Sequence, residues 1–116
     1  MGNFLVVDAG TTRVKVGVLS QDAKLLFQAN EENTPLSPSP GESVIDLGSI
    51  WRLVTKLCRR ALDRYAPSEI GALSFTGNKI AVSFMSRGGR ILLPAMTWMD
   101  SRSCSAYEEN IEELDK

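Results

Sequence analysis

An apolar run at residues 4–7 leads directly into Asp8, and the chain then turns through small residues and returns through alternating valines. A continuously apolar run is typical of a strand buried on both faces, whereas apolar residues at every second position indicate a strand with one buried face. The stretch FLVVDAGTTRVKVGVL therefore predicts an antiparallel hairpin with strands over 3–9 and 13–18. A carboxylate is costly to bury beside valines, so we expect the charge of Asp8 to be compensated at the edge of an apolar sheet.

The rest of the chain alternates between strand-like and helix-like periodicity. A segment rich in proline, serine and glycine predicts a loop over 33–48, and Pro67 is expected to end the helix that precedes it. We expect a third strand around 25–29, a helix over 50–65 with Trp51 on its apolar stripe, and a fourth strand over 69–75. A hairpin of 80–85 with 90–98 is expected to follow. The last expected helix is capped by Asp100 or Ser101, and its apolar stripe includes Tyr107 and Ile111. Antiparallel strands followed by a helical crossover to another strand indicate an α/β fold with a mixed sheet and flanking helices.

Composition and charge exclude several classes of protein. The 116 residues carry a formal net charge of −1, which gives no general attraction to nucleic acid or to anionic membranes. Two cysteines and no histidine leave too few ligands for a zinc site. The N-terminus lacks the pattern of a signal peptide, and no apolar run approaches the roughly 20 residues of a transmembrane helix, so we expect a cytoplasmic protein without a membrane or nucleic-acid partner. The basic residues of the 50–65 helix are interpreted as a solvated face, with a nucleic-acid patch as the less favoured alternative.

The turn after Asp8 has the composition of a phosphate site. Tight turns of small residues expose backbone N–H groups that bind phosphate oxygens, and the hydroxyls of Thr11 and Thr12 can add donors. Asp8 is suited to hold Mg²⁺, directly or through water, and Lys15 adds positive charge if it points toward the turn. The alternative is an ordinary β-turn with a solvated aspartate, because Asp-x-Gly-Thr-Thr alone is a weak signal.

Three blocks of the chain together resemble a known family. The blocks DAGTTRVKVGVL, LSFTGNKIAVSFM and RGGRILLPAMTWMDSRS are similar, in this order, to the N-terminal domain of the FGGY carbohydrate kinases, and the W-x-D-x-R pattern is the most specific part. The resemblance implies an RNase H-like fold of the actin/hexokinase superfamily. It also implies ATP-dependent phosphorylation of a sugar or polyol hydroxyl, with ATP and Mg²⁺ as cofactors.

In the first block, the resemblance implies a site for the nucleotide phosphates. Asp8 matches the family's aspartate beside Mg²⁺ and the phosphates, and is the expected metal ligand. Gly10, Thr11 and Thr12 match the phosphate-binding turn. Lys15 is included with them because its charge lies in the same hairpin.

The second and third blocks are implied to bind the substrate. Asn78 matches the end of the fourth strand, and the next two positions, Lys79 and Ile80, match those that reach the sugar hydroxyls in the family. Asn78 and Lys79 are the expected substrate residues. Trp98 and Asp100 match residues that line the sugar pocket, and Arg102 matches the arginine that closes the motif. Simpler alternatives are a core tryptophan at position 98, a helix N-cap at position 100 and a surface charge at position 79.

The resemblance leaves the substrate and the extent of the protein open. Ile80 stands where the family usually has a polar residue, so the sequence does not indicate which sugar or polyol is bound. Residues 1–116 match the first part of an N-terminal domain, and the general base, the adenine pocket and the C-terminal domain are expected beyond them. We therefore expect this chain by itself to be inactive and to self-associate, for example as a homodimer, through unpaired strand edges.

Two other functions compete with the kinase: a non-catalytic actin-like nucleotide-binding or interaction domain, and a nuclease, which would need several converging carboxylates where only Asp8 is well placed.

Overall fold

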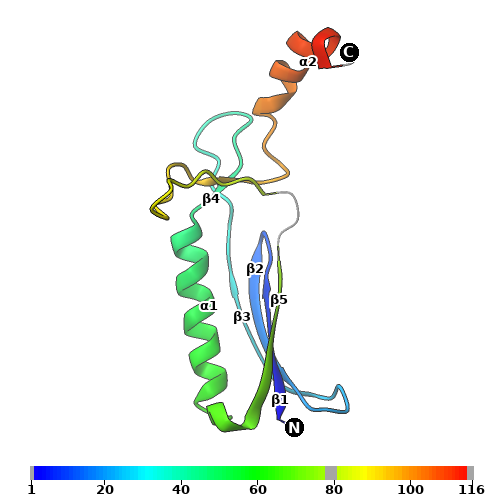
Figure 1. Ribbon diagram of the computed structural model, residues 1–116, viewed down its shortest axis with the longest axis vertical. Helices are drawn as coiled ribbons and strands as arrows, with labels where there is room; N and C mark the ends of the chain where they lie inside the picture. Colours follow the sequence, from blue (N-terminus) through cyan, green and yellow to red (C-terminus); the bar gives the residue numbers. More distant parts are fainter. Residues whose placement is uncertain (1, 78–80, 115–116) are drawn as a thin grey trace.

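The structure, a computed structural model, describes residues 2–77 and 81–114. Its elements are β1 (Asn3–Ala9), β2 (Arg13–Leu19), β3 (Leu25–Glu32), β4 (Val44–Ile45), α1 (Leu47–Leu62), a short 3-10 helix η1 (Pro67–Glu69), β5 (Ile70–Gly77), β6 (Ala95–Met96) and α2 (Arg102–Leu114). Figure 1 shows one long sheet with α1 along one face, while β4 and α2 lie beyond one end of that sheet. The predicted α/β fold with a mixed sheet is confirmed.

The long sheet has the strand order β3-β2-β1-β5. β1 pairs antiparallel with β2, and β2 with β3, whereas β5 runs parallel to β1. A parallel pair needs a crossover connection, which α1 supplies. The core lies between the sheet and α1, and its buried side chains alternate along β2 and recur on one stripe of α1: Val14, Val16, Val18, Val54, Leu57 and Ala61. The predicted N-terminal hairpin and the predicted helix are therefore both present, with their apolar residues facing each other.

The prediction that the first strand is buried on both faces is wrong. Leu5 and Val7 are buried in the core, but Phe4, on the opposite face of β1, is 37% exposed. α1 contacts β2 and β3 most extensively, and among the described residues no helix covers the other face of the sheet. β5 is exposed as well, because Leu73 and Phe75 lie beside Leu5 and Val7 at a sheet edge that α1 does not reach.

α1 begins at a defined cap and ends before a proline. The Asp46 carboxylate accepts a hydrogen bond of 2.9 Å from the Gly48 N–H, which satisfies one of the free donors of the first turn. The helix ends at Leu62, and Pro67 starts η1, in agreement with the predicted stop. Trp51, in contrast, is 63% exposed, so its predicted place on the buried stripe is wrong. Trp51 lies at the border of the buried stripe of α1, to which Leu57 belongs.

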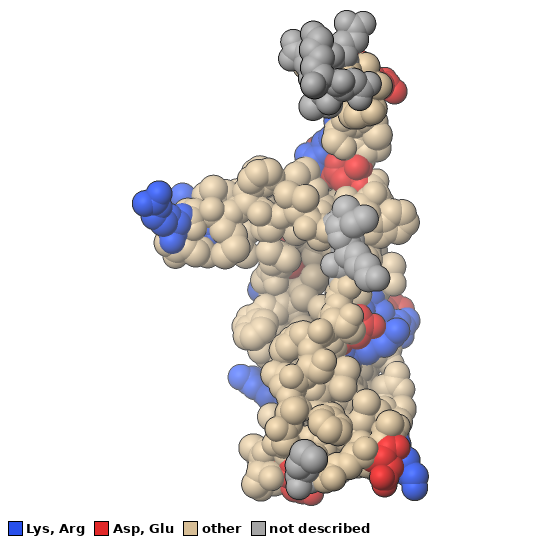
Figure 2. Space-filling model, turned by 45° about the vertical axis from the view of Figure 1, so that its right-hand side comes forward, with Lys and Arg blue, Asp and Glu red and all other residues tan. Residues whose placement is uncertain are grey.

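Basic residues of the predicted 50–65 helix make contacts within the chain. Lys56 pairs with Glu31 of β3 at 2.6 Å, and the Arg64 guanidinium lies 5.5 Å from the centre of the Phe27 ring. On the face shown in Figure 2, Lys and Arg side chains form separate groups rather than one continuous patch. These contacts favour the interpretation of a solvated helix face.

A second, smaller layer is built from segments on both sides of α1. β4 and β6 pair antiparallel, so the segment predicted as a loop over 33–48 contains a strand that the sequence analysis missed. The described part of the predicted hairpin of 80–85 with 90–98 folds back at Gly89, whose φ of 82° suits glycine. It does so through isolated bridges, such as Met85 with Ile91, and not as two regular strands. The second arm lies between two partners, because Met96 of β6 pairs with Val44 of β4 on one edge and with Val82 of the first arm on the other.

α2 projects away from the long sheet (Figure 1). Tyr107 and Ile111, which were expected on its apolar stripe, are exposed to solvent. Within the described residues, no helix is long and apolar enough to cross a membrane.

Candidate functional site

The turn between β1 and β2 closes tightly at Gly10. The Gly10 N–H donates to the Arg13 carbonyl at 3.1 Å, and a Cβ atom at position 10 would lie only 2.8 Å from that same oxygen. A larger residue would therefore force the turn to open. The same Cβ position lies 3.9 Å from Oδ1 of Asp8, so the carboxylate sits beside the turn. The structure thus brings Asp8, Gly10, Thr11 and Thr12 together at one end of the hairpin.

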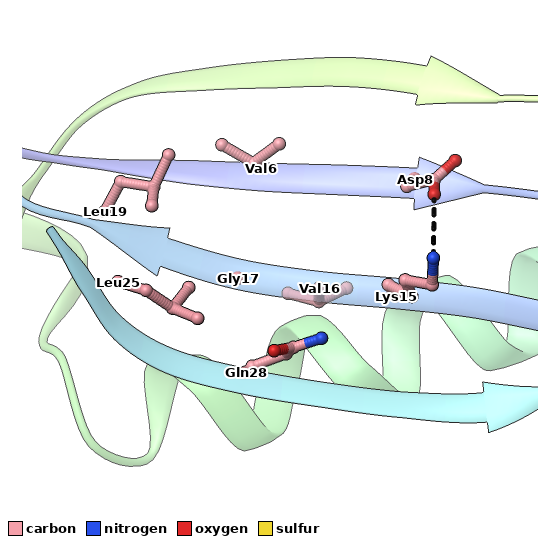
Figure 3. A pocket seen from close by; sticks show the side chains of 8 residues that line it. All are labelled: Val6, Asp8, Lys15, Val16, Gly17, Leu19, Leu25 and Gln28. Carbon is pink, nitrogen blue, oxygen red and sulfur yellow. Dashed lines mark ion pairs between the residues drawn. The ribbon is translucent and has the colours of Figure 1, made fainter. Parts of the chain in front are cut away.

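Asp8 and Lys15 face each other across β1 and β2. They are register partners, and the Lys15 Nζ lies 3.7 Å from the Asp8 Oδ2 (Figure 3). The two side chains remain 48% and 38% exposed, so the ion pair contributes at most about 1 kcal/mol to stability. Lys15 is therefore the partner that compensates Asp8, and the carboxylate stays accessible to a ligand.

An open cavity of about 250 Å³ lies along the sheet beside this ion pair. Figure 3 shows Asp8 and Lys15 at one end of it and aliphatic side chains at the other, with Gln28 on β3. The cavity is polar only near Asp8, Lys15 and Gln28, which identifies the Asp8 end as the place where a charged group would be recognised.

Asn33, which the sequence analysis did not single out, holds the other side of the turn. It is 7% exposed, and its Nδ2 donates to the carbonyl oxygens of Gly10 at 3.3 Å and of Thr11 at 3.0 Å. Its backbone N–H donates to the Thr12 carbonyl at 2.9 Å. The only signal in the sequence is its place directly after the third strand, which many polar residues share.

The parallel pairing of β5 with β1 brings a second segment to the same edge of the sheet. Thr76 lies opposite Asp8, and Gly77 lies opposite Ala9. The carboxyl ends of parallel strands form the edge at which α/β proteins commonly place their ligands. The expected substrate residues Asn78 and Lys79 follow directly and lie outside the described residues, so their roles stay predictions.

Trp98 lies in the second layer and is 62% exposed, so it is not part of the core formed by the described residues. It lines a cavity of about 270 Å³ together with Asp100 and with Val82, Met96, Thr97 and Ser103. In Figure 1, β4 of this layer lies beyond the end of the long sheet that carries the β1–β2 turn. Trp98 and Asp100 thus line one cavity, in the layer that lies beyond the β1–β2 turn.

Asp100 fastens the segment after β6 to the segment before β4. Its Oδ2 accepts hydrogen bonds from the Ser43 N–H at 2.9 Å and from Arg102 Nη2 at 2.8 Å, while its Oδ1 accepts from Arg102 Nε at 2.9 Å and from the Arg102 backbone N–H at 3.2 Å. The guanidinium of Arg102, followed by the Ser43 N–H, holds the pKa of the Asp100 carboxyl well below its usual range. The side chain is only 5% exposed. The hydrogen bond to the N–H at the start of α2 gives Asp100 a capping contact, and Asp100 lines the Trp98 cavity at the same time.

Arg102 helps to join the segment before β4 to the segment after β6, and it does not line the Trp98 cavity. Its Nη1 lies 3.4 Å from Oε1 of Glu42, and it is not among the described residues that line the Trp98 cavity. Next to it, the buried hydroxyls of Ser43 and Thr97 lie 2.7 Å apart. The sequence analysis missed Glu42, Ser43 and Thr97, because residues so far apart in the chain carry no local signal of their contact.

The sequence profile of the N-terminal domain of the FGGY family of carbohydrate kinases matches residues 3–116. The chain belongs to the FGGY family of carbohydrate kinases. The resemblance of the three sequence blocks is thereby confirmed.

Among FGGY relatives, a glycerol kinase of Aquifex aeolicus is 28% identical over 97% of this chain and 24% of its own length. A glycerol kinase of Methylorubrum extorquens is 32% identical over 84% of this chain and 20% of its own length, and a xylulose kinase of Escherichia coli is 24% identical over 93% and 23%. The chain therefore spans about a fifth to a quarter of the length of the curated relatives it matches.

Solved structures of FGGY kinases share the fold. The crystal structure of a xylulose kinase from Rhodospirillum rubrum matches 97% of this chain and 24% of its own chain with a TM-score of 0.90 at 23% identity. A xylulose kinase from Lactobacillus acidophilus matches 97% of this chain and 23% of its own with a TM-score of 0.88 at 16% identity. These likenesses confirm the RNase H-like, actin/hexokinase-type fold that the FGGY resemblance implies.

Proposed function

We propose that this chain is the first part of the N-terminal domain of an ATP-dependent kinase that phosphorylates a hydroxyl of a sugar or polyol. The observation that carries the proposal is the edge of the sheet at which Asp8, the tight turn at Gly10 and the end of β5 converge. Membership of the FGGY family and the names of its relatives, which include glycerol and xylulose kinases, support the same reaction class. Because these substrates and ATP are metabolites of the cell interior, we place the protein in the cytoplasm.

The proposed nucleotide site uses the hairpin. Backbone N–H groups and hydroxyls of Thr11 and Thr12 would bind phosphate oxygens beside Gly10, and Lys15 would add positive charge. Asp8 fits Mg²⁺, since it offers one accessible carboxylate and this ion is usually held by one or two carboxylates together with water and phosphates. When bound, Mg²⁺ neutralises charge that develops on the phosphates during transfer.

The proposed substrate site uses the second layer and the end of β5. Trp98 would pack against the carbon skeleton of the substrate, and Asp100 would form the polar wall of the same cavity. Arg102 would act through Asp100, which it holds in place by two side-chain hydrogen bonds. Asn78 and Lys79 are proposed to reach the substrate hydroxyls from the strand end.

A second candidate function is a non-catalytic nucleotide-binding or interaction domain. It is favoured by the fact that Asp100, the carboxylate of the proposed substrate cavity, is engaged by Arg102 and Ser43, whose contacts lower its pKa and make it a weak base. The exposed edge strand β5 supports the accompanying proposal of a homodimer, because unpaired strand edges invite pairing with a second chain.

Binding measurements on the isotopically labelled chain test the proposal. Mg·ATP is expected to shift the backbone amide signals of Thr11 and Thr12, and glycerol or xylulose is expected to shift the indole signal of Trp98. The variant Trp98→Ala should lose polyol binding and keep the response to Mg·ATP, because it removes pocket wall and no charge. Trp51→Ala, which removes an equally exposed tryptophan on α1, is the matched control. A response to Mg·ATP with none to any sugar or polyol would favour the second candidate.

A further inference from the structure

We propose that Asn33 is a positioning residue of the phosphate site, because its contacts aim the backbone N–H groups of the β1–β2 turn outward. The inference rests on the proposed function, since it concerns how the turn comes to bind phosphate. It adds a residue from the end of β3 to a site that otherwise belongs to the hairpin.

Three consecutive carbonyl groups of the turn point toward Asn33. The side-chain amide donates to the oxygens of Gly10 and Thr11, and the backbone N–H donates to the oxygen of Thr12. In a trans peptide unit, the C=O and the following N–H point in opposite directions. The N–H groups of Thr11, Thr12 and Arg13 are therefore directed away from Asn33.

The turn N–H groups are left available by this arrangement. Among the described residues, the N–H groups of Thr11 and Thr12 donate no hydrogen bond to another protein group. Successive N–H groups directed to one side form the kind of concavity that binds phosphate oxygens. Asn33 itself is buried and its two amide donors are both used, so it acts on a ligand only through the turn.

Removing the amide of Asn33 would leave carbonyl oxygens of the turn without their donors. These bonds are partly buried, and carbonyls that lose a donor rotate toward water or another partner, so the N–H of the same peptide unit rotates with them. The preorganised concavity would then have to be rebuilt at every binding event, which lowers affinity.

A titration of the labelled chain with Mg·ATP tests this role. In Asn33→Ala, we expect about tenfold weaker binding at the amides of Thr11, Thr12 and Arg13, because two hydrogen bonds that fix the turn are lost. The signals of these amides should also shift before any nucleotide is added, while the amide signals of Val16 and Leu57 in the core stay in place. Asn33→Ser keeps one shorter donor and should show an intermediate loss of affinity for Mg·ATP. This variant tests the positioning role of Asn33 if Asn33→Ala does not fold.

Two control variants separate positioning from general stability. Asn30→Ala removes the same type of side chain three residues earlier on β3, where it accepts a hydrogen bond from Arg13 Nη1 and contacts no turn carbonyl, and it should bind as the unchanged chain does. Val18→Ala weakens the core far from the turn and should also keep its affinity. Loss of affinity in Val18→Ala equal to that in Asn33→Ala would overturn the positioning role.

The remaining outcomes distinguish this inference from the proposed function. Absence of any Mg·ATP response at the turn amides of the unchanged chain would overturn both. A clear response of the unchanged chain, matched by undiminished affinity in the two Asn33 variants, would overturn the role of Asn33 alone.

Discussion

At the scale of single residues, the hairpin places a carboxylate where its charge is compensated but still accessible. Lys15 lies opposite Asp8 at 3.7 Å, and both side chains keep substantial contact with water. The sequence predicted that Asp8 needs a compensating partner, because a carboxylate next to a valine run is rarely left without one. It did not predict the contacts of Asn33, because its hydrogen bonds to the turn carbonyls form only when the β1–β2 turn folds against the end of β3.

Substitution of Asp8 by asparagine preserves the shape of the side chain and removes its charge. In the proposed full-length kinase, we expect Asp8→Asn to lower turnover by roughly 100- to 1000-fold and to leave the KM for the sugar almost unchanged, because the proposed site would lose an oriented charge beside the transferring phosphoryl group. Steady-state kinetics at saturating Mg²⁺ measure both quantities. Asp22→Asn, in the exposed turn between β2 and β3, is the matched control, and near-normal turnover of Asp8→Asn would show that the carboxylate has only a structural role.

Asp100 makes the stability of the second layer depend on pH. Its pKa lies below the ordinary value in the folded chain, so the carboxylate stabilises the fold above the ordinary pKa of about 3.9, and this contribution is lost as the pH falls below it. We expect the unchanged chain to lose stability more steeply between about pH 5 and pH 3 than Asp100→Asn does. Denaturant unfolding at a series of pH values measures the difference. Equal slopes for the two proteins would contradict the hydrogen-bonded arrangement around Asp100.

At the scale of the elements, the sequence predicted those whose signal is local. The period-2 valines of β2 and the helical stripe of α1 are read within one element, and the structure contains both. β4 is a two-residue strand in a proline-rich segment, and it forms by pairing with β6, about 50 residues later in the chain. No local sequence pattern therefore predicts it. The 81–98 segment folds back as predicted, and isolated bridges rather than regular strands join its two arms.

The packing of α1 can be tested with two of its apolar residues, one buried and one exposed. Leu57 is fully buried, and Leu57→Ala should lower the free energy of unfolding by about 2–5 kcal/mol through lost contacts and a cavity. Trp51→Ala should change it by less than about 0.5 kcal/mol, since that side chain is mostly in water. Urea unfolding of both variants provides the comparison, and a large effect of Trp51→Ala would place this residue in a contact that the structure does not contain.

At the scale of the whole molecule, the chain is elongated, with extents of 55 × 30 × 28 Å, and much of its apolar surface is uncovered. The uncovered surface includes the outer strand β5 and the segment that folds back after it, with exposed residues Leu73, Phe75, Val82, Phe84, Leu92 and Leu93. The sequence predicted apolar strands here but could not show that α1 would cover only β1, β2 and β3. Large exposed apolar surfaces next to an unpaired strand edge favour association with other chains.

The chain by itself is therefore expected to self-associate at micromolar concentration. Light scattering should show species larger than a monomer, and the double variant Leu73→Gln/Phe75→Gln should reduce them, because both side chains lie on the same face of the edge strand. Leu36→Gln removes an equally exposed leucine from a loop and serves as the control. A strictly monomeric, cooperatively unfolding chain would contradict the prediction.

The parallel pairing of β1 with β5 also determines the order in which the chain can assemble. β1, β2 and β3 are neighbours in sequence, so they can meet as soon as they leave the ribosome. The free edge of β1 must wait until α1 has been synthesised and has carried β5 back to it, and closing such a long loop is slow. During this interval the backbone of β1 around Asp8 is open on one side, so the strand that carries Asp8 keeps an unpaired edge until β5 arrives.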